Sequence, residues 1–134
     1  METHSEIRVL IVDEHPSVRK ALAARLTAFP NIAVLATAAG LAQGLESLRL
    51  YLPDVVLLDL RDKGDRGSNP VRHLVNTLAD RAVGIIVLTS FADDREREMI
   101  LQAGAQRYLL KNIDSTRLVA EIEAVAAEVG ARML

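Results

Sequence analysis

The stretch PDVVLLDLR, residues 53–61, decides the fold of this chain. Its four consecutive apolar residues, 55–58, end on an acid, Asp59. A short, continuous apolar run rich in β-branched residues is typical of a strand buried on both faces, as in parallel sheets. Ligands of open parallel sheets bind just beyond the carboxyl ends of the strands. We therefore expect Asp59 at a functional edge, although Asp is also common where a solvated turn begins.

Similar patterns recur on both sides of this stretch. Short apolar runs predict four further strands, and apolar positions at helical spacing predict helices between them. Because parallel strands need crossover connections, this alternation predicts an α/β fold with one parallel sheet covered by helices on both faces. The alternation leaves the order of the strands open. The further strands are 7–12, 32–36, 83–88 and 107–110, and the helices are 17–29, 41–52, 71–78, 93 or 94 to 103, and 114 or 115 to 129.

Several helix ends have recognisable signals. Asn69 followed by Pro70 predicts a helix start with a cap and then a proline. Asp93 or Asp94 can cap the start of the fourth helix. Gly104 follows that helix at the position where a left-handed residue commonly ends a helix. These signals support the predicted boundaries.

Composition excludes several classes of function. The 134 residues fit one domain, half of them apolar and 25% charged. Aromatic residues make up only 3%, so the core must consist of Leu, Val, Ile and Ala. A net charge of −2 offers no basic surface for nucleic acid, and the lack of Cys excludes disulfides, a thiolate nucleophile and a cysteine zinc site. The N-terminus resembles neither a signal peptide nor a membrane span, which is compatible with a cytoplasmic location.

Polar side chains follow four of the predicted strands. They are Asp13 and Glu14, then Asp59, then Thr89 and Ser90, and finally Lys111. In a parallel sheet these residues share one edge, where three acids close together cost free energy and raise each other's pKa. A Mg²⁺ ion relieves that repulsion, because it prefers oxygen ligands and binds through one or two carboxylates. The edge therefore predicts a Mg²⁺ site with a flanking positive charge.

Phosphoryl transfer is the chemistry that needs such a set. Catalysis of this reaction rests on positioning and on electrostatic stabilisation of the phosphoryl oxygens. A carboxylate can act as the nucleophile, and Asp59 is the candidate. Mg²⁺ would bind one phosphoryl oxygen, the Thr89 hydroxyl could donate to a second, and Lys111 could pair with a third.

With these residues identified, the chain resembles the receiver domain of bacterial two-component response regulators over essentially its whole length. The matching segments are VLIVDEHPSVRKAL, PDVVLLDLR, IIVLTSFADD and AGAQRYLLKN. The likeness is greatest to the branch with a NarL/LuxR-type helix-turn-helix output. It implies a flavodoxin-like (βα)5 fold, a three-layer sandwich with sheet order 2-1-3-4-5. It also implies a signalling protein that catalyses only its own phosphorylation and dephosphorylation.

The resemblance also implies roles for individual residues. Asp59 would be phosphorylated by a sensor histidine kinase, and Asp13 and Glu14 would hold Mg²⁺. Further implied roles are Asp59 and the backbone carbonyl of Arg61 as metal ligands, Thr89, Ser90 and Lys111 as phosphoryl-binding or switch residues, and Tyr108 as the switch aromatic. The surface of the fourth helix, fifth strand and fifth helix would then change its partners, with a homodimer as one outcome.

Two features depart from the family pattern. The second acid is Glu14 rather than Asp, so its carboxylate lies further out and metal affinity is altered, or it binds through a water. After Asp59, Asp62 and Lys63 stand where the family has an apolar residue and a proline. This loop either alters phosphoryl lifetime or kinase choice, or is simply a solvated loop.

Alternative functions remain open. A pseudo-receiver would keep the fold and act as an interaction or dimerisation module without phosphorylation. A flavin carrier or a phosphatase of this architecture fits less well, because the first loop lacks hydroxyls and glycines and has His15 where a second Asp is wanted. We expect His15 to be a turn residue before Pro16, with a phosphorelay residue or a metal ligand as alternatives.

The domain assignment is a single receiver over residues 1–134. The resembling regulators continue beyond this point into a linker and a DNA-binding domain. We therefore expect this chain to reach DNA only through an output domain that it does not include, and we favour its being cut from a longer protein. We expect a sensor histidine kinase as its partner and no association with membranes.

Overall fold

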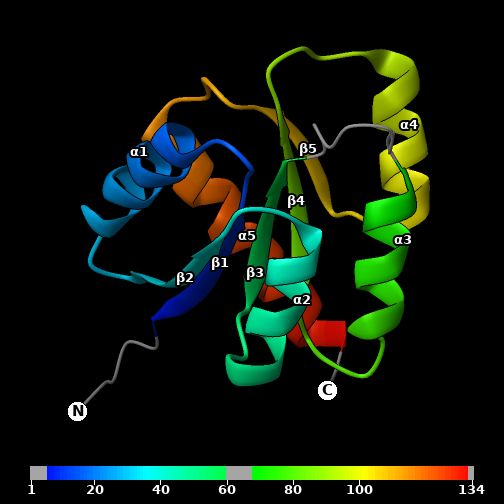
Figure 1. Ribbon diagram of the computed structural model, residues 1–134, viewed down its shortest axis with the longest axis horizontal. Coiled ribbons are helices and arrows are strands. Elements are labelled where there is room, and N and C mark those ends of the chain that lie inside the picture. Colours follow the sequence, from blue (N-terminus) through cyan, green and yellow to red (C-terminus); the bar gives the residue numbers. More distant parts are fainter. Residues whose placement is uncertain (1–5, 60–67, 133–134) are drawn as a thin grey trace.

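A computed structural model describes residues 6–59 and 68–132, in which five strands alternate with five helices (Figure 1). In chain order the elements are β1 (Ile7–Val12), α1 (Pro16–Thr27), β2 (Ile32–Ala38), α2 (Leu41–Leu50), β3 (Val55–Asp59), α3 (Ser68–Thr77), β4 (Gly84–Thr89), α4 (Asp94–Ala103), β5 (Arg107–Leu110) and α5 (Ser115–Arg132). The predicted alternation of strands and helices is confirmed.

The strands form one parallel sheet in the order β2-β1-β3-β4-β5. This order confirms the flavodoxin-like (βα)5 fold. The register places Val12 beside Leu58 and Asp59 beside Leu88. Asp13, which follows Val12, and Asp59, which follows Leu58, therefore lie next to each other at the carboxyl edge of the sheet.

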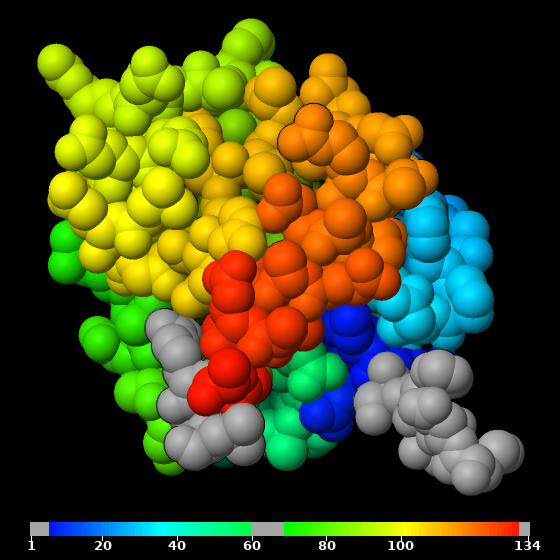
Figure 2. All heavy atoms as spheres, turned by 180° about the vertical axis from the view of Figure 1, so that it is seen from behind, coloured from blue at the N-terminus to red at the C-terminus, as the bar shows by residue number. Residues whose placement is uncertain are grey.

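Alternate residues of the sheet feed two apolar layers. One face carries Leu10, Val56 and Val87, which pack under α2, α3 and α4. The other face carries Ile11, Leu57 and Ile86, which pack under α1 and α5. Figure 2 shows this second face from behind, where α5, in orange and red, runs beside α4, in yellow. The central strands are buried on both faces because each face has its own helical layer.

Some element ends differ from the predicted ones. Strand β2 continues to Ala38, because its last residues still pair with β1. Helix α2 ends at Leu50, and Tyr51 is already extended, with φ −125° and ψ 148°. The prediction of a helix to Leu52 was wrong, because Pro53 disfavours the helical conformation of the residue before it. At the other end, α5 runs past Val129 to Arg132.

The start of α3 also differs. The helix begins at Ser68, so Asn69 is its second residue and not its cap. Pro70 is still tolerated, since the N–H groups of the first helical turn need no intrahelical partner. The proline correctly indicated a helix start, but it placed that start too late.

Both ends of α4 follow the predicted signals. Asp93 is the N-cap, and its carboxylate accepts a hydrogen bond from the Glu96 N–H at 3.3 Å. Gly104 ends the helix with φ 120°, a conformation that favours glycine. A Cβ at this position would also lie 2.7 Å from Cγ2 of Val75, so both conformation and space require glycine.

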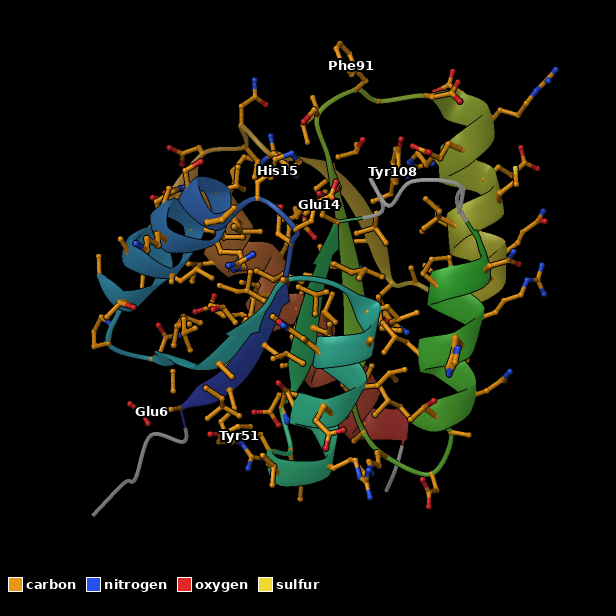
Figure 3. All side chains as sticks on the ribbon, viewed as in Figure 1. Glu6, Glu14, His15, Tyr51, Phe91 and Tyr108 are labelled. Atoms are coloured by element: carbon orange, nitrogen blue, oxygen red, sulfur yellow. The ribbon has the colours of Figure 1, made fainter. Side chains whose placement is uncertain are left out.

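The two ends of the sheet differ in chemistry. His15, Glu14, Phe91 and Tyr108 lie at the carboxyl end, whereas Tyr51 lies at the opposite end (Figure 3). Among the helices within residues 6–59 and 68–132, none has the length and apolar character needed to cross a bilayer.

Candidate functional site

Two carboxylates are buried at the carboxyl edge of the sheet. Asp13 directly follows β1, and Asp59 is the last residue of β3. Their side chains are only 3% and 2% exposed. The pairing of Val12 with Leu58 brings the two residues next to each other. Burial of two like charges is costly, so this edge requires a compensating cation.

Lys111 provides that positive charge. Its Nζ lies 2.8 Å from Oδ2 of Asp13 and 3.0 Å from Oδ2 of Asp59. The Lys111 side chain is 17% exposed, so the ion bridge is largely shielded from water. The Lys111 N–H donates to the Thr89 carbonyl at 2.8 Å, which continues the pairing of β5 with β4 beyond the strand end. The fifth strand thereby delivers the amine to the two aspartates.

Asp13 is held in its ionised form. Burial alone would raise the pKa of this carboxyl, but hydrogen bonds from Lys111 and from the His15 N–H more than offset it. The net result is a pKa below the ordinary value of 3.8. The His15 N–H donates to Oδ1 of Asp13 at 2.9 Å, and the ring Nδ1 of His15 lies 3.3 Å from the same oxygen.

A metal ion could be held beside these carboxylates. Asp13, His15 and Asp59 each offer one ligand atom, and these atoms lie within 4.8 Å of one another. The two carboxylates match the oxygen ligands that Mg²⁺ prefers, so the donor set fits the predicted ion. Glu14 is exposed and does not belong to this group. The predicted ligand Arg61 lies outside the described residues, as do Asp62 and Lys63.

His15 is the N-cap residue of α1, directly before Pro16. It is the residue before the first helical residue of α1, with φ −91° and ψ 114°. Its ring also approaches Asp13, which keeps the alternative of a metal ligand open. The structure is therefore compatible with both of these roles.

Thr89 and Tyr108 meet at one carbonyl group. The buried Thr89 hydroxyl donates to the Phe91 carbonyl oxygen at 3.1 Å, and the Tyr108 hydroxyl lies 3.3 Å from the same oxygen. Tyr108 also donates to Oε1 of Glu96 at 2.5 Å and accepts from the Asp93 N–H at 3.2 Å. Figure 3 shows Tyr108 beside α4, below the segment that carries Phe91. The two predicted switch residues are therefore linked through the segment between β4 and α4.

The Tyr108 hydroxyl is kept protonated. Burial raises the pKa of this phenol, and the hydrogen bond to the Glu96 carboxylate raises it further above 10.0. The ring itself is buried against the apolar layer beneath α4. In this conformation the predicted switch aromatic faces inward.

Ser90 lies apart from this hydrogen-bonded group. It is exposed and lines a cavity of about 410 Å³ with Asp13 and Lys111. The apolar wall of this cavity comes from α1, including Val18 and Leu22. The cavity therefore lies between α1 and the Asp13–Lys111 ion pair.

Sequence reasoning missed two residues that contact predicted site residues. Arg19 of α1 donates to the Asp13 carbonyl oxygen at 2.8 Å, and no pattern in the sequence signals this contact. Glu96 stands three residues after the Asp93 cap, the spacing of a capping box. That spacing could have drawn attention to Glu96, but its side chain bonds Tyr108.

Comparisons with known proteins agree with this geometry. A family model described as the response regulator receiver domain matches residues 9–123. The transcriptional regulatory protein LiaR of Bacillus subtilis (strain 168) is 38% identical over 120 residues, which are 90% of this chain and 56% of LiaR. MctR of Rhizobium johnstonii is 39% identical over 128 residues, which are 94% of this chain and 58% of MctR. The chain thus spans a little over half the length of these relatives.

Solved structures give the same result. The signal receiver domain of the putative response regulator NarL from Mycobacterium tuberculosis has a TM-score of 0.82 and 27% identity, covering 92% of this chain and 98% of that one. A LuxR-family two-component response regulator from Aurantimonas sp. SI85-9A1 has a TM-score of 0.83 and 31% identity, covering 92% of this chain and 87% of that one. The paired aspartates, the bridging lysine and the matched family model lead to one conclusion: this chain belongs to the response regulator receiver domain family.

Proposed function

We propose that this receiver accepts a phosphoryl group on Asp59 from the phosphohistidine of a sensor histidine kinase. The observation that carries the proposal is the bridge from Lys111 to Asp13 and Asp59, at 2.8 and 3.0 Å, between side chains shielded from water. A carboxylate held beside an ammonium group is well placed to attack, because the growing charge on the phosphoryl oxygens is stabilised where it forms.

The steps assign a role to each group. A carboxylate oxygen of Asp59 attacks phosphorus, an O–P bond forms, and the P–N bond to the kinase imidazole breaks. Lys111 moves from its contact with Asp59 to a phosphoryl oxygen while it keeps Asp13 as its partner. Ser90, which lines the adjacent cavity, would donate a hydrogen bond to the incoming group.

Asp13, Asp59, Glu14 and the Arg61 carbonyl would hold Mg²⁺. When bound, this ion neutralises charge on the phosphoryl oxygens and fixes their orientation. Asp13 is ready for such a role because its pKa is low and its carboxylate is therefore ionised. Glu14 is exposed, so we expect it to act through a water and to matter less than Asp13.

Phosphorylation would be transmitted through Thr89. Its hydroxyl would leave the Phe91 carbonyl for a phosphoryl oxygen, which removes its contact with the carbonyl oxygen that Tyr108 also approaches. The surface of α4, β5 and α5 would then change, favouring a homodimer or a different contact with an output domain. The relatives LiaR and MctR, both named as transcriptional regulatory proteins, support a transcriptional output.

The test is the intact mass of the protein after incubation with acetyl phosphate and Mg²⁺. We expect one phosphoryl adduct in the wild type and in Asp80→Asn, whose aspartate is exposed and distant from the edge. We expect none in Asp59→Asn. Omission of Mg²⁺ should abolish the adduct as well.

The outcomes separate the alternatives. An adduct that survives in Asp59→Asn would mean that another residue is the phosphoacceptor. No adduct in the wild type, together with no Mg²⁺-dependent change in tyrosine fluorescence, would favour a phosphorylation-independent module. Comparison of Glu14→Gln with Asp13→Asn then tests the metal ligands, with the larger rise in the Mg²⁺ requirement expected for Asp13→Asn.

A further inference from the structure

We propose that Arg25 of α1 is a positioning residue that holds Lys111 in place for phosphoryl transfer. This inference rests on the proposed function, since it concerns how the ammonium group reaches Asp59. The guanidinium of Arg25 does not act on the reacting atoms themselves. It binds the backbone of the segment that follows β5 and carries Lys111.

Three donors of one guanidinium group contact this segment. Arg25 Nη1 donates to the Lys111 carbonyl at 3.4 Å, and Nη2 donates to the Ile113 carbonyl at 2.5 Å. Nε donates to Oγ of Ser115, the first residue of α5, at 2.8 Å. Because a guanidinium is planar and rigid, these three contacts fix the segment in several directions at once.

Arg25 is itself firmly held. It lies in the last turn of α1, beside the buried residues Leu22 and Leu26, which pack into the core against α5. Groups that position a reacting side chain are effective when they stand on such a packed element. The side chain of Arg25 is partly buried at the edge of this contact, which shields its hydrogen bonds.

The same helix also holds the other half of the ion bridge. Arg19, about one and a half turns earlier, donates to the Asp13 carbonyl at 2.8 Å. Helix α1 thus contacts the backbone of Asp13 through one arginine and that of Lys111 through another. One helix therefore contacts the backbone at both ends of the ion pair between Lys111 and Asp13.

The alternative is that Arg25 merely anchors α5 to α1. An anchor would lower stability when removed, but it would change the reaction rate independently of Lys111. A positioning residue has a different signature, since its effect requires the group that it positions. The two possibilities are therefore separated by combining substitutions.

The experiment measures the rate of phosphorylation by acetyl phosphate and Mg²⁺ in Arg25→Ala, Lys111→Met and the double variant. We expect Arg25→Ala to slow the reaction about 10-fold or more, because small misplacements of reacting groups have such effects. In the Lys111→Met background the same change should have no further effect. Arg25→Lys should recover part of the rate, since it keeps the charge but not the three-donor geometry.

Two controls accompany these rates. Lys20→Ala removes an exposed cation from the same helix and should leave the rate unchanged. Amide hydrogen exchange at residues 111–113 should increase in Arg25→Ala, while exchange in β3 should not. If Arg25→Ala fails to fold, Arg25→Lys and Ser115→Ala provide milder losses for the same double-variant comparison.

The outcomes are distinct. An unchanged rate in Arg25→Ala, or losses that add fully with Lys111→Met, would overturn the positioning role while leaving the proposed function intact. If the wild type takes up no phosphoryl group on Asp59, the proposed function fails first and this inference fails with it. A rate loss confined to variants that retain Lys111 supports the inference.

Discussion

Replacing Lys111 with Met removes the cation that bridges two buried aspartates and should lower the free energy of unfolding. The ammonium lies 2.8 Å from Asp13 and 3.0 Å from Asp59, in side chains that are 3% and 2% exposed. Methionine keeps most of the side-chain volume, so the substitution mainly removes charge. The two carboxylates are then left close together without compensation.

The magnitude is bounded by two limits. Breaking a buried ion pair by removing one partner costs about 3–5 kcal/mol. Protonating one aspartate relieves the repulsion, and at a pH about three units above its ordinary pKa this costs about 4 kcal/mol. The variant adopts whichever of these two states costs less, so protonation limits the loss to about 4 kcal/mol. We therefore expect a loss of about 3–4 kcal/mol near neutral pH.

Urea unfolding followed by circular dichroism, in EDTA, measures this loss. The matched control is Lys20→Met, which removes an exposed lysine and should change stability by less than about 0.5 kcal/mol. The pKa of Asp13 is lowered in the folded state, so the bridge stabilises above pH 3.8 and loses its contribution as pH falls through the folded pKa. The difference between wild type and variant should therefore shrink in acid.

Two results would refute this reasoning. A loss of less than about 1 kcal/mol near neutral pH would mean that desolvation of the ions cancels their attraction. A difference that stays constant in acid would mean that lost packing, not lost charge, causes the destabilisation. Adding Asp13→Asn to Lys111→Met should restore part of the stability, because one of the two like charges is gone.

Three further predictions concern the frame of the site. The thermal stability of Tyr108→Phe should fall less at alkaline pH than that of the wild type. The raised pKa of Tyr108 contributes stability below pH 10.0, and this contribution is lost as pH rises through the pKa of the folded state. Thermal unfolding across this pH range measures the difference. Gly104→Ala should lower the free energy of unfolding by about 2 kcal/mol, because its φ is 120° and a Cβ would lie 2.7 Å from Val75; urea unfolding measures it. Arg107→Met should cost about 1 kcal/mol, less at high salt, because it removes ion pairs at 2.6 and 2.5 Å with two glutamates of α5; unfolding at two salt concentrations tests it.

Each of these has a contradicting outcome. Equal alkaline profiles for Tyr108→Phe and the wild type would show that burial and the hydrogen bond to Glu96 do not keep the hydroxyl protonated. An Ala at position 104 without cost would mean that the end of α4 can shift away from α3. A salt-independent loss for Arg107→Met would assign its role to packing of the side-chain stem.

The carboxyl edge was predictable because its residues stand at the ends of strands. Asp13, Asp59 and Lys111 each come directly after a short apolar run, and parallel strands bring such residues together. The boundaries that failed had local causes that the apolar pattern does not report. The end of α2 was set by the residue before Pro53, and the start of α3 was misplaced because proline tolerates several positions in the first turn.

The sequence by itself determined the alternation of strands and helices, the apolar layers and the candidate phosphoacceptor. These features depend on periodicity and on the residue types at the carboxyl end of each strand, which are local properties of the chain. The strand order came from family resemblance, since the alternation is compatible with several orders.

Only the tertiary structure decided which side chains meet. Lys111 contacts a residue 98 positions away in the chain, and Arg25 binds a segment 86 to 90 positions away. Tyr108 donates a hydrogen bond to Glu96 on a neighbouring helix. A long, flexible side chain can reach several partners, and the packing of α1, α4 and α5 on the sheet decides which of them it contacts. Backbone periodicity carries no information about which partner is contacted. The contacts of Lys111, Arg25 and Tyr108 are therefore known only from the folded structure.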